Sequence, residues 1–242
     1  MDIVKDVGAR WEIPPDLRLS LLALLSADPT HVATMTYDEF MEWADEDTLA
    51  EWVDGRVVMT SPASARHQDI GVFLTNVLAE HARTHDLGRV LLAPFQMRLP
   101  TSGREPDVLF VAREHMGRVL QNRVEGPADL VVEIVSPESR VRDCGEKFYE
   151  YQEGGVGEYW LIDPDTRRVD FYQLDPDGIY QSVLPDADGV YRSRAMDGLW
   201  VRVAWLWQEL LPDVSKVMLE IDGAAYAQRL IADLTDAGFL PS

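Results

Sequence analysis

The stretch Asp129–Lys147, DLVVEIVSPESRVRDCGEK, decides the fold of this chain. It opens with an apolar, mostly β-branched run, Leu130–Val135, which is interrupted by a single acid, Glu133. Branched residues at nearly every position are typical of a strand that is covered on both faces. An ionised carboxylate in such a strand needs a metal ion, a cation or hydrogen-bond donors. Glu133 therefore marks a candidate site, and Lys147, in the helix expected next, is a candidate partner.

A second acid precedes another apolar run upstream. Glu105-Pro106-Asp107 leads into Val108–Val111, which we expect to be a neighbouring strand. Two acids on adjacent strands with a lysine nearby form an arrangement that binds Mg²⁺ and positions water. Three simpler interpretations stay open. Asp107 could cap a strand, Glu133 could pair with a buried Arg or Lys without a metal, and Lys147 could be an ordinary ion-pair partner of Asp143.

Length and composition indicate one large domain, or one domain with terminal extensions. The chain has 242 residues, of which 46% are hydrophobic, enough for a substantial core. Cys144 is the single cysteine, so a disulfide framework within the chain is excluded, which fits a reducing cytoplasm. No apolar stretch approaches the roughly 20 residues that span a bilayer, so we expect no membrane segment.

The charge distribution limits the partners. A formal net charge of −20 argues against a protein that coats nucleic acid electrostatically. The segment from Arg89 to Lys147, however, carries as many basic as acidic residues, so the net charge lies in the flanks. A polyanion could approach this middle segment; the alternative is a solvated surface of mixed charge.

Patterning predicts an α/β organisation in three segments: an N-terminal helical extension at 1–34, a main domain at 35–210 and a C-terminal helical segment at 211–242. Thr36 and Glu39 form a capping box before a short helix, and Asp54-Gly55 predicts a hairpin. The remaining expected elements are helices at 65–84, from Asp143 (as N-cap) to 153 and at 224–234, strands at 89–99, 106–111, 130–135 and 158–162, and an antiparallel meander over 169–203.

These motifs together resemble the Uma2 endonuclease family, a branch of the PD-(D/E)XK restriction-endonuclease-like nucleases. The resemblance covers roughly Thr36 to Leu206. It rests on EWVDG at 51–55, SP at 61–62 with RHQ at 66–68, PD at 106–107, VEIVSP at 132–137, RD at 142–143 with Lys147, and GV at 155–156 with EYWLIDP at 158–164. It implies a mixed central sheet flanked by helices, with an antiparallel β extension.

One departure concerns the lysine. The general nuclease pattern has its lysine two residues after the second acid, a position held here by Val135. The resembling family takes a lysine from the following helix, which would be Lys147. Asp143, Lys147 and Tyr151 are spaced to share one face of that helix.

The resemblance implies a role for each candidate residue. Asp107, Glu133 and the carbonyl of Ile134 would bind Mg²⁺ or Mn²⁺, and Lys147 would orient or help deprotonate the attacking water. Glu51 could hold a second ion or a metal-bound water, although a solvated hairpin residue is the simpler interpretation. His67, Gln68 and Glu158 are candidates for supporting the ligands or contacting substrate.

The implied function is a Mg²⁺-dependent endodeoxyribonuclease that hydrolyses phosphodiester bonds in DNA, expected to act as a homodimer in the cytoplasm. Two other classes stay open. One is a non-catalytic binding module that keeps the nuclease fold, which the acidic net charge favours. The other is an interaction protein that dimerises through the apolar segment at 200–207.

Overall fold

The computed structural model describes residues 34–44, 48, 50–59, 63–136, 139 and 142–240. The chain divides into two compact units, Met1–Met59 and Thr60–Ser242. The hairpin after the first described helix belongs to the N-terminal unit. The three segments expected from sequence, at 1–34, 35–210 and 211–242, stay a prediction. The segment 1–33, expected to hold a helical extension, lies outside the described residues. Among the described residues, no helix is long and apolar enough to span a membrane.

The N-terminal unit contains helix α2 (Tyr37–Trp43) and the hairpin β1 (Ala50–Val53) and β2 (Arg56–Met59). The predicted capping box is confirmed: Thr36 Oγ1 accepts from the Glu39 backbone N–H, and the Glu39 carboxylate accepts from the Thr36 N–H. The hairpin turn is also confirmed. Asp54 (φ 46°) and Gly55 (φ 83°) both adopt the left-handed conformation that a two-residue type I′ turn requires.

The second unit is built on a six-stranded mixed sheet in the order β11-β10-β9-β8-β6-β3. Its strands are β3 (Gly88–Leu92), β6 (Val108–Ala112), β8 (Leu130–Ile134), β9 (Glu158–Asp163), β10 (Arg168–Leu174) and β11 (Tyr180–Ser182). β8 and β9 pair in parallel, and the other neighbours pair antiparallel. The predicted restriction-endonuclease-like mixed sheet is therefore present.

Further strands extend this unit. β4 (Gln96–Arg98) pairs antiparallel with β5 (Ser102–Arg104) and parallel with β7 (Arg123–Glu125). The single strand expected over 89–99 is wrong: it is divided into β3 and β4 at Pro94, which has no N–H to donate to a ladder. The expected C-terminal meander is partly separate, because β12 (Val190–Arg192) and β13 (Trp200–Arg202) pair only with each other.

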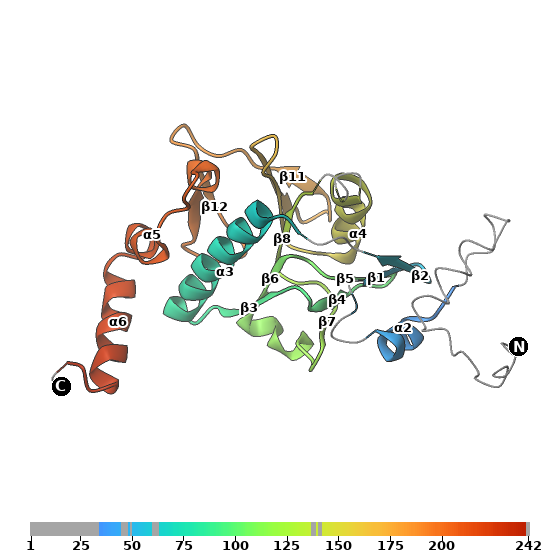
Figure 1. Cartoon of the computed structure of the whole chain (residues 1–242), viewed down its shortest axis with the longest axis horizontal. Helices are drawn as coiled ribbons and strands as arrows, with labels where there is room; N and C mark the ends of the chain where they lie inside the picture. The colour runs from blue at the N-terminus through green and yellow to red at the C-terminus, as the bar shows by residue number, and fades with distance from the viewer. Residues whose placement is uncertain are drawn as a thin grey trace, which may run out of the picture. The chain divides into compact units, whose positions relative to one another are not determined.

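Helices cover both faces of the central sheet. α3 (Ala65–His85) lies on one side of β8 and α4 (Lys147–Gly154) on the other (Figure 1). α5 (Val214–Ile221) packs against α3, and α6 (Ala224–Asp236) follows it. Short helical turns occupy η1 (Arg113–Arg118), η2 (Arg142–Glu146) and η3 (Val203–Trp207).

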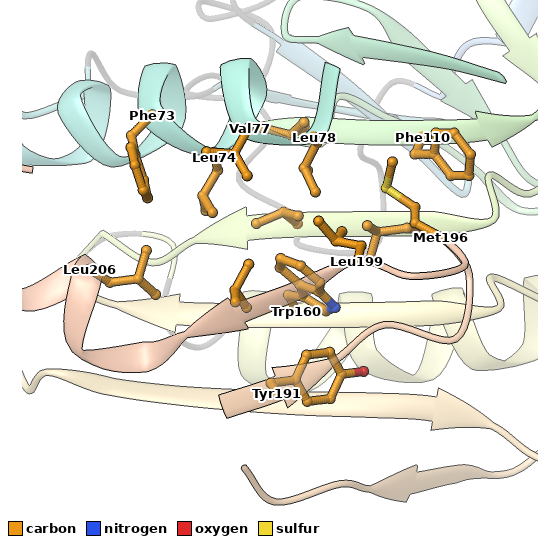
Figure 2. Close-up of a cluster of buried hydrophobic side chains, with 14 of the residues drawn as sticks. Phe73, Leu74, Val77, Leu78, Phe110, Trp160, Tyr191, Met196, Leu199 and Leu206 are labelled. Atoms are coloured by element: carbon orange, nitrogen blue, oxygen red, sulfur yellow. The ribbon is translucent and has the colours of Figure 1, made fainter. Parts of the chain in front are cut away.

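Alternation along β8 separates two cores. Leu130, Val132 and Ile134 pack in the cluster beneath α3, which also contains Phe73 and Trp160. Figure 2 shows Phe73 pointing from α3 into this cluster. Val131 and Val135 instead pack with Tyr151 of α4 in the second cluster. Because side chains alternate along a strand, Glu133 faces α4.

Candidate active site

The two strand-borne acids lie opposite each other. β6 and β8 pair antiparallel with Val108 opposite Val132, so one further step along the ladder places Asp107 opposite Glu133, on the α4 face of the sheet. Asp107 directly precedes β6, and its Oδ2 accepts a hydrogen bond from the Ile134 backbone N–H at 2.7 Å. The structure therefore brings together the three residues expected to bind a metal.

Glu133 is a buried carboxylate with two donors on one oxygen. Its residue surface is 4% exposed. Lys147 Nζ donates to Glu133 Oε1 at 2.9 Å, and Tyr151 Oη donates to the same oxygen at 2.6 Å. These charge-assisted hydrogen bonds offset part of the desolvation cost of the carboxylate. Lys147 therefore supplies positive charge of the kind that an ionised carboxylate in this apolar strand needs.

α4 supplies both donors because residues four positions apart lie on the same side of a helix. Lys147 begins the helix and Tyr151 lies one turn further on. Asp143 lies one turn earlier, in the π-helical turn Arg142–Glu146, so the expectation that it caps this helix is wrong. The backbone is already helical at Asp143 and continues without a cap into α4, which frees the Asp143 side chain to face the site instead.

Asp143 adds a third carboxylate to the site, and this one is buried like Glu133. Its side chain is 2% exposed, and its Oδ1 lies 3.3 Å from Lys147 Nζ. This is an ion pair without hydrogen-bond geometry: Oδ1 has no hydrogen-bond partner among the residues described. With Asp107 and Glu133, the site holds three carboxylates against one lysine, an excess of negative charge that a divalent cation would offset.

His67 also lies at the site. Ser64 caps α3 by accepting from the His67 backbone N–H, and the ring then points its Nε2 to within 3.2 Å of Asp107 Oδ2. Burial lowers the pKa of His67. The hydrogen bond and charge of Asp107, together with the backbone of Ile134 and the charge of Asp143, outweigh burial and raise this pKa above its ordinary value. His67 is therefore held next to a proposed metal ligand.

Two candidate residues of the same unit, Gln68 and Glu158, are not brought to this group. Gln68 is on the exposed side of α3 and lines a surface hollow with Asn76 and Leu210. Glu158 lies on the opposite face of the sheet, where Trp160, Tyr191, Ser193 and two backbone N–H groups donate to its carboxylate. Glu51 lies on β1 of the N-terminal unit, paired in register with Val58, and its role stays a prediction.

One ion pair was missed from sequence. Arg104, on β5, is fully buried and makes a bidentate pair with Glu150 of α4, with nitrogen–oxygen distances of 2.8 and 2.6 Å. This contact fixes the same helix that carries Lys147. The two residues are 46 positions apart. No local pattern in one sequence predicts their pairing.

A mixed sheet with helices on both faces, two opposed acids and a lysine from the following helix defines a restriction-endonuclease-like α/β protein. Residues 37–204 match the profile of the Uma2 family, described as "Putative restriction endonuclease". Because the match covers more than half of the chain, this protein belongs to the Uma2 family. The family assignment supports a nuclease-like function in general terms.

A solved structure shares the fold. It is described as "a putative nuclease belonging to DUF820 from Anabaena variabilis ATCC 29413". It aligns with a TM-score of 0.63 at 19% sequence identity, covering 73% of this chain and 99% of that chain. A search of curated proteins found no match.

Proposed function

We propose that this protein is a metal-dependent endonuclease that hydrolyses phosphodiester bonds in DNA. The observation that carries the proposal is the buried ammonium of Lys147 between Glu133 and Asp143, on the face of the sheet where Asp107 lies opposite Glu133. Family membership supports the reaction class.

The donor set suits a hard divalent cation. Mg²⁺ and Mn²⁺ prefer oxygen ligands and keep several waters, so Asp107, Glu133 and the Ile134 carbonyl would suffice. The buried Oδ1 of Asp143, which has no hydrogen-bond partner among the described residues, fits the same requirement for positive charge. A bound ion would lower the pKa of a coordinated water and stabilise negative charge on the phosphoryl oxygens.

The protein's own residues would act as donors and orienters. Lys147 is held by carboxylates on two elements, so its ammonium has a fixed direction and can hydrogen-bond an attacking water and the developing negative charge. Tyr151 restricts the Glu133 carboxylate to one orientation. His67 supports Asp107 from α3 and, when protonated, could contact a phosphate oxygen.

Two finer features complete this proposal. The single cysteine is consistent with a cytoplasmic protein. A homodimer would let the protein act on both strands of a duplex, and a measurement of molecular mass in solution tests it.

The alternative candidate is a binding module that keeps the fold without turnover. The net charge of −20 favours it, because an isolated nuclease must overcome repulsion to approach DNA. Metal dependence separates the two candidates. The enzyme needs the ion for cleavage, whereas the module binds its partner in EDTA.

The test combines Mn²⁺ titration calorimetry with a plasmid-nicking assay in Mg²⁺, Mn²⁺ or EDTA. The variants are Asp107→Asn and Glu133→Gln, with the exposed Glu114→Gln as a control of equal charge change. We expect wild type and Glu114→Gln to bind Mn²⁺ and nick DNA, and both site variants to lose both properties while keeping a native circular dichroism spectrum. Metal binding without nicking in the wild type would favour the module. Equal Mn²⁺ binding by all four proteins would overturn the metal site.

A further inference from the structure

A second group of metal-ligating side chains lies away from the carboxylate site. His81 and His85 are one turn apart on α3, and Asp222 directly follows α5. His81 Nδ1 lies 3.0 Å from both carboxylate oxygens of Asp222, and His85 Nε2 lies 2.8 Å from Asp222 Oδ1. One ligand atom from each residue lies within 4.8 Å of the other two. Among the described residues, no other three His, Cys, Asp or Glu side chains meet in this way.

Hydrogen-bond chemistry at His81 indicates that a positive group belongs between these residues. His81 Nε2 lies 2.9 Å from the Asp197 carbonyl oxygen, which can only accept, so Nε2 carries the proton. In a neutral imidazole, Nδ1 then presents a lone pair to the Asp222 carboxylate, which also only accepts. The His81 side chain is fully buried and that of Asp222 is 4% exposed, so water cannot relieve this contact. A proton on His81 Nδ1 or on the Asp222 carboxyl, or a metal ion, must therefore lie between the two acceptors.

The backbone around His81 favours the arrangement in which Nε2 carries the proton and Nδ1 is available to bind a metal. Gly198 follows Asp197 and has φ +80°, a conformation that L side chains rarely adopt. This turn lies against the imidazole: a Cβ at Gly198 would be 3.7 Å from His81 Cε1. An imidazole N–H held by a backbone carbonyl fixes the tautomer and directs the other nitrogen, as is usual for histidines that bind metals.

We propose that His81, His85 and Asp222 bind a Zn²⁺ ion. Two imidazoles and one carboxylate suit a borderline transition metal, whereas Mg²⁺ prefers an all-oxygen set. Ligand atoms around tetrahedral zinc are separated by about 3.3 Å, so the observed separations of 2.8 and 3.0 Å require only a small outward movement. The His85 side chain is 35% exposed, so water can complete the coordination.

The ion would have a structural role. It would join two turns of α3 to the end of α5, two helices that already pack against each other (Figure 1). Asp222 is also immediately followed by Gly223, the residue before α6. Zinc would therefore fix where α5 ends and α6 begins relative to α3. This site involves none of the residues of the proposed nuclease site, so either proposal can fail without the other.

The test uses full-length protein freed of metal with EDTA, then titrated with ZnCl₂ by calorimetry and with CoCl₂ by visible absorption. His85→Gln is the main variant because this half-exposed side chain can change without disrupting the core. Asp222→Asn is the second variant. His115→Gln is the matched control, since His115 also pairs with an aspartate, Asp129 at 2.7 Å, but belongs to no three-residue cluster among the described residues.

We expect the wild type and His115→Gln to bind one Zn²⁺ and to give the intense visible bands of four-coordinate cobalt. His85→Gln should bind at least about tenfold more weakly, because even altering an outer-shell partner costs 10–100-fold in metal affinity. An Asp107→Asn/Glu133→Gln double variant should bind Zn²⁺ like the wild type. No Zn²⁺ binding by the wild type, or unchanged binding by His85→Gln and Asp222→Asn, would overturn the site and leave His81 and Asp222 as a buried ion pair.

Discussion

Lys147 Nζ lies 2.9 Å from Glu133 Oε1, and both side chains are only 5% exposed. The helix-borne lysine and the strand-borne acid are 14 residues apart in the chain. A buried pair of this kind contributes little net stability compared with apolar residues, but removing one partner is costly because the other charge is left in the interior. Its presence on the same face of the sheet as Asp107 is better explained by chemistry than by folding.

The pair leads to a test by double-mutant cycle. Lys147→Met should lower the free energy of unfolding by about 3–5 kcal/mol, because Glu133 and Asp143 then lack their shared cation. Glu133→Gln/Lys147→Met should recover part of that loss, with a coupling energy of about 1–3 kcal/mol. Urea denaturation in EDTA measures all four proteins. Additive losses would show that the two side chains do not interact in solution.

A substitution at Tyr151 tests how much its hydrogen bond to Glu133 contributes beyond the ion pair between Glu133 and Lys147. Tyr151→Phe keeps the ring in the core and removes the hydroxyl that donates to Glu133. We expect a loss of about 1.5–3 kcal/mol in unfolding free energy, since the hydrogen bond is to a charged group. Tyr149→Phe is the control on the same helix, because Tyr149 is 63% exposed and should change stability by less than about 0.5 kcal/mol.

Much of the fold and part of the site could be predicted from sequence, because both depend on local patterns. The acid within an apolar strand predicted that Glu133 needs a partner such as a cation, and Lys147 in the following helix was a candidate partner. The structure has Lys147 Nζ 2.9 Å from Glu133 Oε1. The absence of a capping role for Asp143 could not be predicted, because its DxxE spacing also fits an N-cap and only the π-helical turn that contains Asp143 decides against it. The Arg104–Glu150 pair depends on how β5 meets α4, which no local pattern contains.

The raised pKa of His67 predicts a pH-dependent contribution to stability. A histidine whose pKa is higher in the folded state than its ordinary 6.5 stabilises the fold fully below that value. The contribution is lost as the pH rises through the folded-state pKa. We therefore measure the unfolding free energies of wild type and His67→Gln in EDTA. The wild type should be the more stable protein, and its advantage should be larger at pH 5.5 than at pH 8.5. An equal difference from wild type at both pH values would contradict the proposed contact with Asp107.

Glu158 tests the separation of the two faces of the sheet. Both of its carboxylate oxygens accept hydrogen bonds, from Trp160 and Tyr191 on one and from Ser193 and two backbone N–H groups on the other. Glu158→Gln replaces one acceptor oxygen with an NH₂ group that faces donors, so we expect a loss of about 2–4 kcal/mol in urea denaturation. Glu153→Gln, at an exposed position of α4, is the control and should leave stability within about 0.5 kcal/mol.

Mn²⁺ affinity of the folded Glu158→Gln protein decides what this residue does. Because its carboxylate is on the face opposite Glu133, affinity should equal that of the wild type even though the protein is less stable. A loss of Mn²⁺ affinity at temperatures where the variant is fully folded would mean that the sheet transmits the change to the other face. Glu158 would then act on the metal site indirectly, as its place in the sequence motif first suggested.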